Sequence, residues 1–155
     1  MHYGAIGHTR EEIVRQSKNK EKTIYQWSSY VPIGNAAAKL DAWKKQGAEI
    51  FYLTSRVKSE EVESIKKVLK VYSFPDGHLF FRRQGKQYQD IAAEILPDIL
   101  VEDDCESIGG AEQMTITHIK PGIKARIKSI PVKEFGSIDY LPDELTALKS
   151  YQGKP

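Results

Sequence analysis

Two short apolar runs, each followed at once by polar residues, constrain the fold of this chain most. Residues 48–53 read Ala-Glu-Ile-Phe-Tyr-Leu and lead into Thr54, and residues 99–101 read Ile-Leu-Val and lead into Glu102. Runs of this length and composition are typical of strands buried on both faces of a sheet. Helical patterns separate them, so we expect βαβ crossovers and a mostly parallel α/β sheet flanked by helices.

Cap and turn residues place the other elements. Thr9 and Glu12 form a capping box, which predicts a helix from there through about residue 17. Residues 18–30 are polar with scattered aromatics and predict a loop. Further helices are predicted to begin near residues 35, 59, 86 and 143, and further strands at 79–81, 114–117 and 129–132.

The composition fits one domain over residues 1–155 and excludes several function classes. A net charge of +2, from 23 basic and 21 acidic residues, gives no excess of positive charge for binding nucleic acid or an anionic membrane. No apolar run approaches the roughly 18 residues that span a bilayer, and residues 1–20 lack the apolar core of a signal peptide. We therefore expect a cytoplasmic protein without an internal disulfide, since Cys105 is the only cysteine.

Polar residues at the ends of the two apolar strands are the candidate site, because parallel sheets bind ligands beyond the carboxyl ends of their strands. Thr54 directly follows a buried strand, where its hydroxyl and the following amides can face an anion. Lys86 stands before a helix and could bring an ammonium to the same anion. Asp103 and Asp104 close the second strand, and their hard carboxylate oxygens suit Mg²⁺.

These motifs, in this order, resemble those of the haloacid-dehalogenase (HAD) phosphohydrolases, with the similarity strongest over residues 31–110. The resemblance implies a Rossmann-like fold in which Thr54, with Ser55 and Arg56, binds the phosphoryl group and Lys86 offsets its charge. It also implies that Asp103 holds Mg²⁺, reinforced by Asp104 or Glu102. The alternatives to Lys86 are Arg82, Arg83 and Lys58.

One part of the family pattern is absent from the chain. The first family motif is an apolar strand ending in Asp-x-Asp, which supplies the nucleophile and the general acid/base. The first aspartate here is Asp41, inside a predicted amphipathic helix. We therefore expect the chain as written to be inactive, and expect its first central strand to lie upstream of Met1 or to be replaced by residues 1–6 or 129–132.

Two functions follow from the resemblance. The first is a Mg²⁺-dependent phosphohydrolase acting on a small phosphate ester, with its nucleophile outside this chain. The alternative is a non-catalytic module that keeps a phosphate or metal pocket for binding or scaffolding. A receiver domain is disfavoured because too few βα units follow Asp104, and a dinucleotide-binding domain because no Gly-x-Gly-x-x-Gly follows a strand.

Other conspicuous residues have less specific interpretations. Trp27, Tyr25 and Tyr30 could line a substrate entrance or pack as core. Cys105 is interpreted as a small packed side chain. His118 is interpreted as structural, because it has no partner at metal-ligand spacing.

Overall fold

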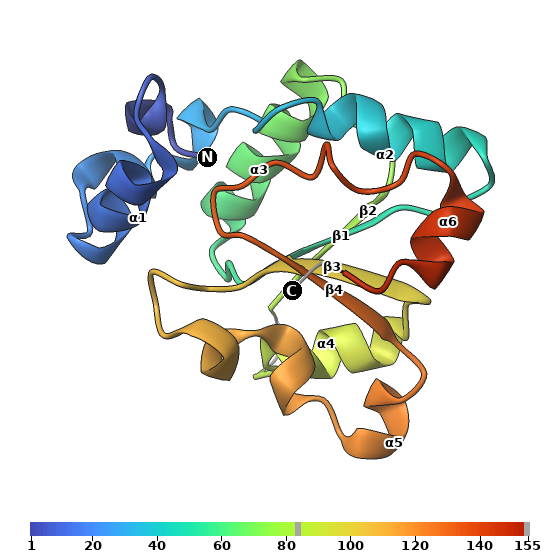
Figure 1. Cartoon of the computed structure of the whole chain (residues 1–155). Coiled ribbons are helices and arrows are strands. Elements are labelled where there is room, and N and C mark those ends of the chain that lie inside the picture. The colour runs from blue at the N-terminus through green and yellow to red at the C-terminus, as the bar shows by residue number, and fades with distance from the viewer. Residues whose placement is uncertain (83–84, 154–155) are drawn as a thin grey trace.

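Helices and short strands alternate along the chain in the computed structural model, which describes residues 1–82 and 85–153 (Figure 1). The α-helices are α1 (Arg10–Lys18), α2 (Ala36–Lys45), α3 (Ser59–Val71), α4 (Tyr88–Ile95), α5 (Pro121–Lys124) and α6 (Leu145–Ser150). The strands are β1 (Phe51–Thr54), β2 (His78–Phe81), β3 (Ile99–Asp103) and β4 (Lys128–Val132). Short 3₁₀ turns are η1 (Tyr3–Ala5), η2 (Lys22–Tyr25), η3 (Trp27–Ser29), η4 (Gly110–Gln113) and η5 (Thr115–His118). The mixed α/β class predicted from the sequence is confirmed.

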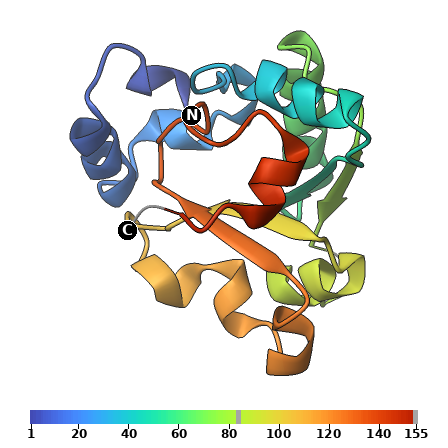
Figure 2. The ribbon, with the colours of Figure 1, turned by 45° about the vertical axis from the view of Figure 1, so that its right-hand side comes forward.

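The strands form two separate parallel pairs, whereas the sequence predicted one sheet. β1 pairs with β2 from Phe51 opposite His78 onward. β3 pairs with β4 from Ile99 opposite Lys128 onward. β1, β3 and β4 run in the same direction, and β3 lies between β1 and β4 in both views (Figures 1 and 2). The parallel connections are therefore as predicted, but the single sheet was wrong within the described residues.

Apolar cores cover both faces of the β3–β4 pair. The first core joins Trp43 of α2, Ile130 and Val132 of β4, and Leu141 and Leu148 near the carboxyl end. The second core, on the side of α4 and η5, joins Ala92, Met114, Ile116, Ile119 and Ile127. Neighbouring residues of β3 divide between the cores, because alternate side chains of a strand point to opposite faces: Ile99 and Val101 pack on the first and Leu100 on the second.

Burial of the strands differs from the prediction. β1 and β3 were predicted to be buried on both faces, yet none of their residues is fully buried, and Phe51 is 39% exposed. In β4, by contrast, Ile130 and Val132 are only 3% and 8% exposed. The physical reason is packing: Ile130 and Val132 are members of the first core, whereas the apolar residues of β3, and Leu53 of β1, only pack against the two cores as partly buried residues.

Local signals at helix starts were accurate. The Thr9 hydroxyl accepts the Glu12 N–H at 3.3 Å, and the Glu12 carboxylate accepts the Thr9 N–H at 2.8 Å. This capping box opens α1 as predicted, with Ile13 and Val14 buried. α2, α3 and α4 also begin close to their predicted starts.

Three local predictions need correction. Residues 114–117 do not form a strand. Residues 115–117 lie in η5, and the Thr115 and Ile116 N–H groups donate to the carboxylate of Glu102, which is far away in the sequence. Asp143 and Glu144 precede α6 and do not form its first turn. The predicted loop at 18–30 contains the end of α1 and the turns η2 and η3.

The segments considered as replacements for a central strand lie elsewhere. Residues 3–5 form η1, and the Met1 amine donates to the Val31 carbonyl at 2.6 Å. Residues 129–132 lie in β4, on the far side of β3 from β1. Within residues 1–82 and 85–153, no helix has the length and apolar character needed to cross a membrane.

Candidate functional site

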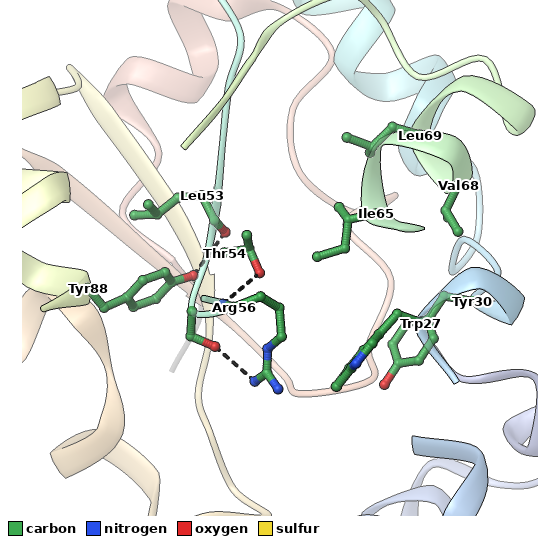
Figure 3. A pocket seen from close by; sticks show the side chains of 10 residues that line it. Trp27, Tyr30, Leu53, Thr54, Arg56, Ile65, Val68, Leu69 and Tyr88 are labelled. Atoms are coloured by element: carbon green, nitrogen blue, oxygen red, sulfur yellow. Dashed lines mark hydrogen bonds between the residues drawn. The ribbon is translucent and has the colours of Figure 1, made fainter. Parts of the chain in front are cut away.

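A pocket of about 270 Å³ opens at the carboxyl end of β1 (Figure 3). Its polar side is formed by Thr54, Ser55 and Arg56, which directly follow the apolar part of the strand. Its other walls come from η3, α3 and the start of α4. The lining residues are Trp27, Tyr30, Leu53, Thr54, Ser55, Arg56, Ile65, Val68, Leu69 and Tyr88. The three residues predicted from the sequence to bind phosphate therefore share one pocket.

The polar side is organised by bonds among these three residues. The Thr54 hydroxyl accepts the Arg56 N–H at 3.3 Å, and the Arg56 guanidinium donates to the Ser55 hydroxyl at 2.9 Å. The guanidinium carbon lies 4.5 Å from the centre of the Trp27 ring, in a cation–π contact. Among the described residues no carboxylate lies within 4 Å of this guanidinium. Arg56 is thus oriented by neutral neighbours, which leaves its charge for a ligand.

The opposite wall is aromatic and apolar. The Trp27 indole N–H donates to Glu61 of α3 at 3.2 Å, which ties η3 to that helix. The Trp27 and Tyr30 rings lie 5.2 Å apart between centroids. Burial raises the pKa of Tyr30 to about 12 against the opposing charge of Arg56, so the phenol stays neutral and donates to the Ile24 carbonyl at 2.8 Å. Ile65, Val68 and Leu69 complete this wall.

Of the three aromatics singled out in the sequence, two line the pocket. Trp27 and Tyr30 do, whereas Tyr25 is 55% exposed and lies roughly perpendicular to the Trp27 ring, with 6.4 Å between the ring centroids. Sequence reasoning missed the pocket role of Tyr88, Ile65, Val68 and Leu69, because apolar and aromatic residues at helical spacing predict a buried helix face. The periodic stripe of α3 is the same whether it meets a core or a pocket, so no sequence signal separates the two.

Tyr88 lies between the ends of β1 and β3. Its hydroxyl donates to the Leu53 carbonyl at 3.0 Å. Burial is the main cause that raises the pKa of Tyr88, and the charges of Glu102 and Asp103 at the end of β3 raise it further. The phenol is therefore a permanent hydrogen-bond donor at neutral pH.

The acidic residues at the end of β3 are bound by the protein itself. Glu102 accepts the Thr115 and Ile116 N–H groups at 2.7 and 3.0 Å. Asp103 accepts the Cys105 N–H at 2.8 Å. Asp104 accepts the Glu134 N–H at 3.0 Å and pairs with Lys133 at 3.0 Å. Each carboxylate is thus engaged in holding a turn or loop.

This arrangement does not fit a magnesium site by itself. In the described part of the chain, no three side chains of the metal-binding types are grouped closely enough to hold an ion. Mg²⁺ needs several oxygen ligands in near-octahedral geometry. Asp103 and Asp104 alone do not supply such a set.

The groups of the protein that contact Asp104 shift its pKa. Partial burial pushes the pKa of Asp104 upward, but the Glu134 N–H and the Lys133 ammonium outweigh it and hold the pKa below its usual value. Burial raises the pKa of the neighbouring Cys105 thiol to about 12, helped by Asp103. Cys105 packs against the second core, in agreement with its interpretation as a packed side chain.

Lys86 does not join the pocket at β1. Its ammonium pairs with Glu94 of α4 at 2.6 Å, and it lines a separate pocket of about 160 Å³ beside His78 and Phe80. Of its alternatives, Lys58 is exposed, and Arg83 lies outside the described residues. Arg82 stands next to the site, since its backbone N–H donates to the Arg56 carbonyl at 3.2 Å.

Comparisons with protein-family models, with curated proteins and with solved structures found no match to this chain.

Proposed function

We propose that this chain is a HAD-like domain that binds a small phosphate ester at the carboxyl end of β1. The observation that carries the proposal is Arg56, held over Trp27 beside the Thr54 and Ser55 hydroxyls at the pocket. A guanidinium without a carboxylate partner, next to two hydroxyls, is suited to phosphate oxygens. The facing wall of Trp27, Ile65 and Val68 suits an apolar or aromatic organic group on that phosphate.

The proposed reaction class is phosphate-ester hydrolysis with a nucleophile that these 155 residues do not provide. In that reaction Thr54 and Arg56 would hold the phosphoryl oxygens and spread their charge. The Mg²⁺ of the resemblance stays a prediction, because the carboxylates at β3 have protein partners in this arrangement. The same observation favours the second candidate, a module that binds the ester without turnover.

Titration calorimetry with phenyl phosphate tests the binding step. Arg56→Ala should weaken binding at least about tenfold, since a charge-assisted bond contributes about 1.5–3 kcal/mol. Lys58→Ala is the matched control: it removes the same charge two residues away, outside the pocket lining, and should change affinity less than about twofold. Equal losses in both variants, or no heat with the wild-type chain, would refute the proposed pocket.

Turnover separates the two candidates. We expect no release of inorganic phosphate from phenyl phosphate by the 155-residue chain, with or without Mg²⁺. Release that depends on Mg²⁺ would mean that a nucleophile within these residues has been overlooked. Release by a longer polypeptide that adds an aspartate strand would favour the hydrolase over the binding module.

A further inference from the structure

The pocket at the end of β1 offers hydrogen-bonding groups to a ligand on one side only, that of residues 54–56. Among the described residues, the other lining side chains with a polar group are Trp27, Tyr30 and Tyr88. Each of them donates within the protein, Trp27 to the Glu61 carboxylate and the two tyrosines to backbone carbonyls, over 2.8 to 3.2 Å. A ligand that brings several hydroxyl groups to this side would therefore leave some of them without a partner.

Both faces of the Trp27 ring are covered by the protein. The Arg56 guanidinium carbon lies 4.5 Å from the ring centre, and the Tyr30 ring lies 5.2 Å away between centroids. Figure 3 shows Trp27 between these two side chains. Stacking of an aryl group on Trp27 would require a free ring face. The ring therefore presents an apolar edge to the pocket and no stacking surface for a ligand.

The rest of the lining consists of branched aliphatic side chains. Ile65, Val68 and Leu69 come from α3, and Leu53 comes from β1. In Figure 3 the Ile65 side chain extends from α3 toward Thr54, so the aliphatic wall begins next to the proposed phosphate site. Each methylene group that a ligand buries against such a wall adds to its affinity in proportion to the area removed from water.

The volume of the pocket limits the length of that alkyl group. About 270 Å³ holds about nine non-hydrogen atoms at the roughly 30 Å³ that a water molecule occupies in the liquid. A phosphate group uses about five of these, which leaves room for about four carbons. Carbons beyond that number would extend into solvent through the opening of the pocket.

We propose that the ester bound at the end of β1 is the phosphate of a short aliphatic alcohol with about four carbons. The inference rests on the proposed function and adds the identity of the alcohol, which is neither a sugar nor an aryl group. Thr54 and Arg56 hold the phosphate, and the carbon chain lies along the wall that contains Ile65 and Val68.

Titration calorimetry of the full 155-residue chain with straight-chain alkyl phosphates, from methyl to hexyl, tests the proposal. We expect affinity to rise about threefold with each methylene up to butyl and then to level off. Equal affinities from methyl to butyl, or a rise that continues to hexyl, would overturn the inference. Binding of methyl phosphate that Arg56→Ala abolishes would still support the proposed function in that case, whereas no heat with any member would refute both.

Two further ligands test the chemical class of the alcohol. Glycerol 1-phosphate has the carbon number of propyl phosphate but should bind at least about tenfold more weakly, because its hydroxyls find no partner on the aliphatic side. Phenyl phosphate should bind more weakly than butyl phosphate, because its ring is larger than the remaining space and meets no free ring face. Tighter binding of either ligand than of its alkyl counterpart would contradict an aliphatic alcohol.

A substitution in the wall separates binding of the carbon chain from binding of the phosphate. Val68→Thr places a hydroxyl where a methyl group lines the pocket, and should weaken butyl phosphate about fivefold while methyl phosphate changes less than about twofold. Val71→Thr is the matched control, since Val71 lies on the same helix, is 72% exposed and is outside the lining. Thermal melts verify that both variants fold. An equal loss for the two ligands in Val68→Thr, or the same losses in Val71→Thr, would overturn the assignment of the wall.

Discussion

The ends of β1 and β3 carry polar residues in equivalent places but use them differently. At the end of β3, Glu102, Asp103 and Asp104 all accept hydrogen bonds from nearby backbone. At the end of β1, Thr54, Ser55 and Arg56 bond to one another and line a pocket. The comparison teaches that polar groups after an apolar strand can either hold the structure together or remain available to a ligand. The partners of each group, and not its residue type, distinguish the two.

The largest expected loss in the free energy of unfolding comes from a substitution at the end of β3. Glu102→Ala should lower the free energy of unfolding by about 3 kcal/mol, because it leaves two amides of the buried residues Thr115 and Ile116 without an acceptor. Urea denaturation measures the change, with the exposed Glu112→Ala on η4 as the control. A loss below about 1 kcal/mol would mean that water or another group replaces Glu102, and the comparison would fail at that residue.

Asp104 adds a smaller, pH-dependent contribution. Its pKa is lower in the folded chain than its ordinary 3.8, so its stabilisation is complete above that ordinary value and is lost as pH falls through the folded value. Asp104→Asn should cost about 1 kcal/mol at neutral pH, and the difference from wild type should close below about pH 4. Urea melts at several pH values test this, with Asp98→Asn as the control. A gap that persists in acid would show that packing, and not charge, is lost.

At the end of β1, a substitution should lower the free energy of unfolding by less. Arg56→Ala removes a cation–π contact and one hydroxyl bond at an open pocket, which together contribute about 0.5–1 kcal/mol. Thermal or urea melts compare it with Lys58→Ala. A loss as large as that of Glu102→Ala would make Arg56 a structural residue, and the contrast between the two strand ends would disappear.

The smallest effect expected is that of Mg²⁺. Because the β3 carboxylates already have partners, millimolar MgCl₂ should leave the melting temperature of the chain unchanged relative to the same ionic strength of NaCl. A rise specific to Mg²⁺ that disappears in Asp103→Asn would show that Asp103 releases the Cys105 amide to bind the ion. The two ends of the strands would then both be ligand sites.

The sequence predicted elements whose signals are local. The Thr9 capping box, the acidic start of α3 and the apolar runs of β1 and β3 all depend on residues a few positions apart. It failed at 114–117, where the deciding group, Glu102, is 13 residues away from Thr115. Two separate strand pairs are compatible with the expected lack of a central strand, but the pairing of β3 with β4 is a tertiary outcome that no local signal sets.

At the candidate site, too, local signals were predictive and tertiary contacts were not. Thr54, Ser55 and Arg56 line one pocket because they are consecutive and follow one strand, and their binding role stays a prediction. Lys86 was assigned by its place in the motif order, but the direction of its side chain depends on Glu94 in the next helix. Motif order places a residue near a region of the fold, whereas competing charges decide what its side chain meets.

The two tryptophans of the chain occupy the pocket and the core respectively. Trp27 is half-buried beside Arg56, and Trp43 is 4% exposed within the first core. Their fluorescence should therefore differ in colour, with Trp43 emitting at shorter wavelength and Trp27 sensitive to whatever enters the pocket. The chain thus carries two built-in optical reporters, one for ligand binding and one for unfolding.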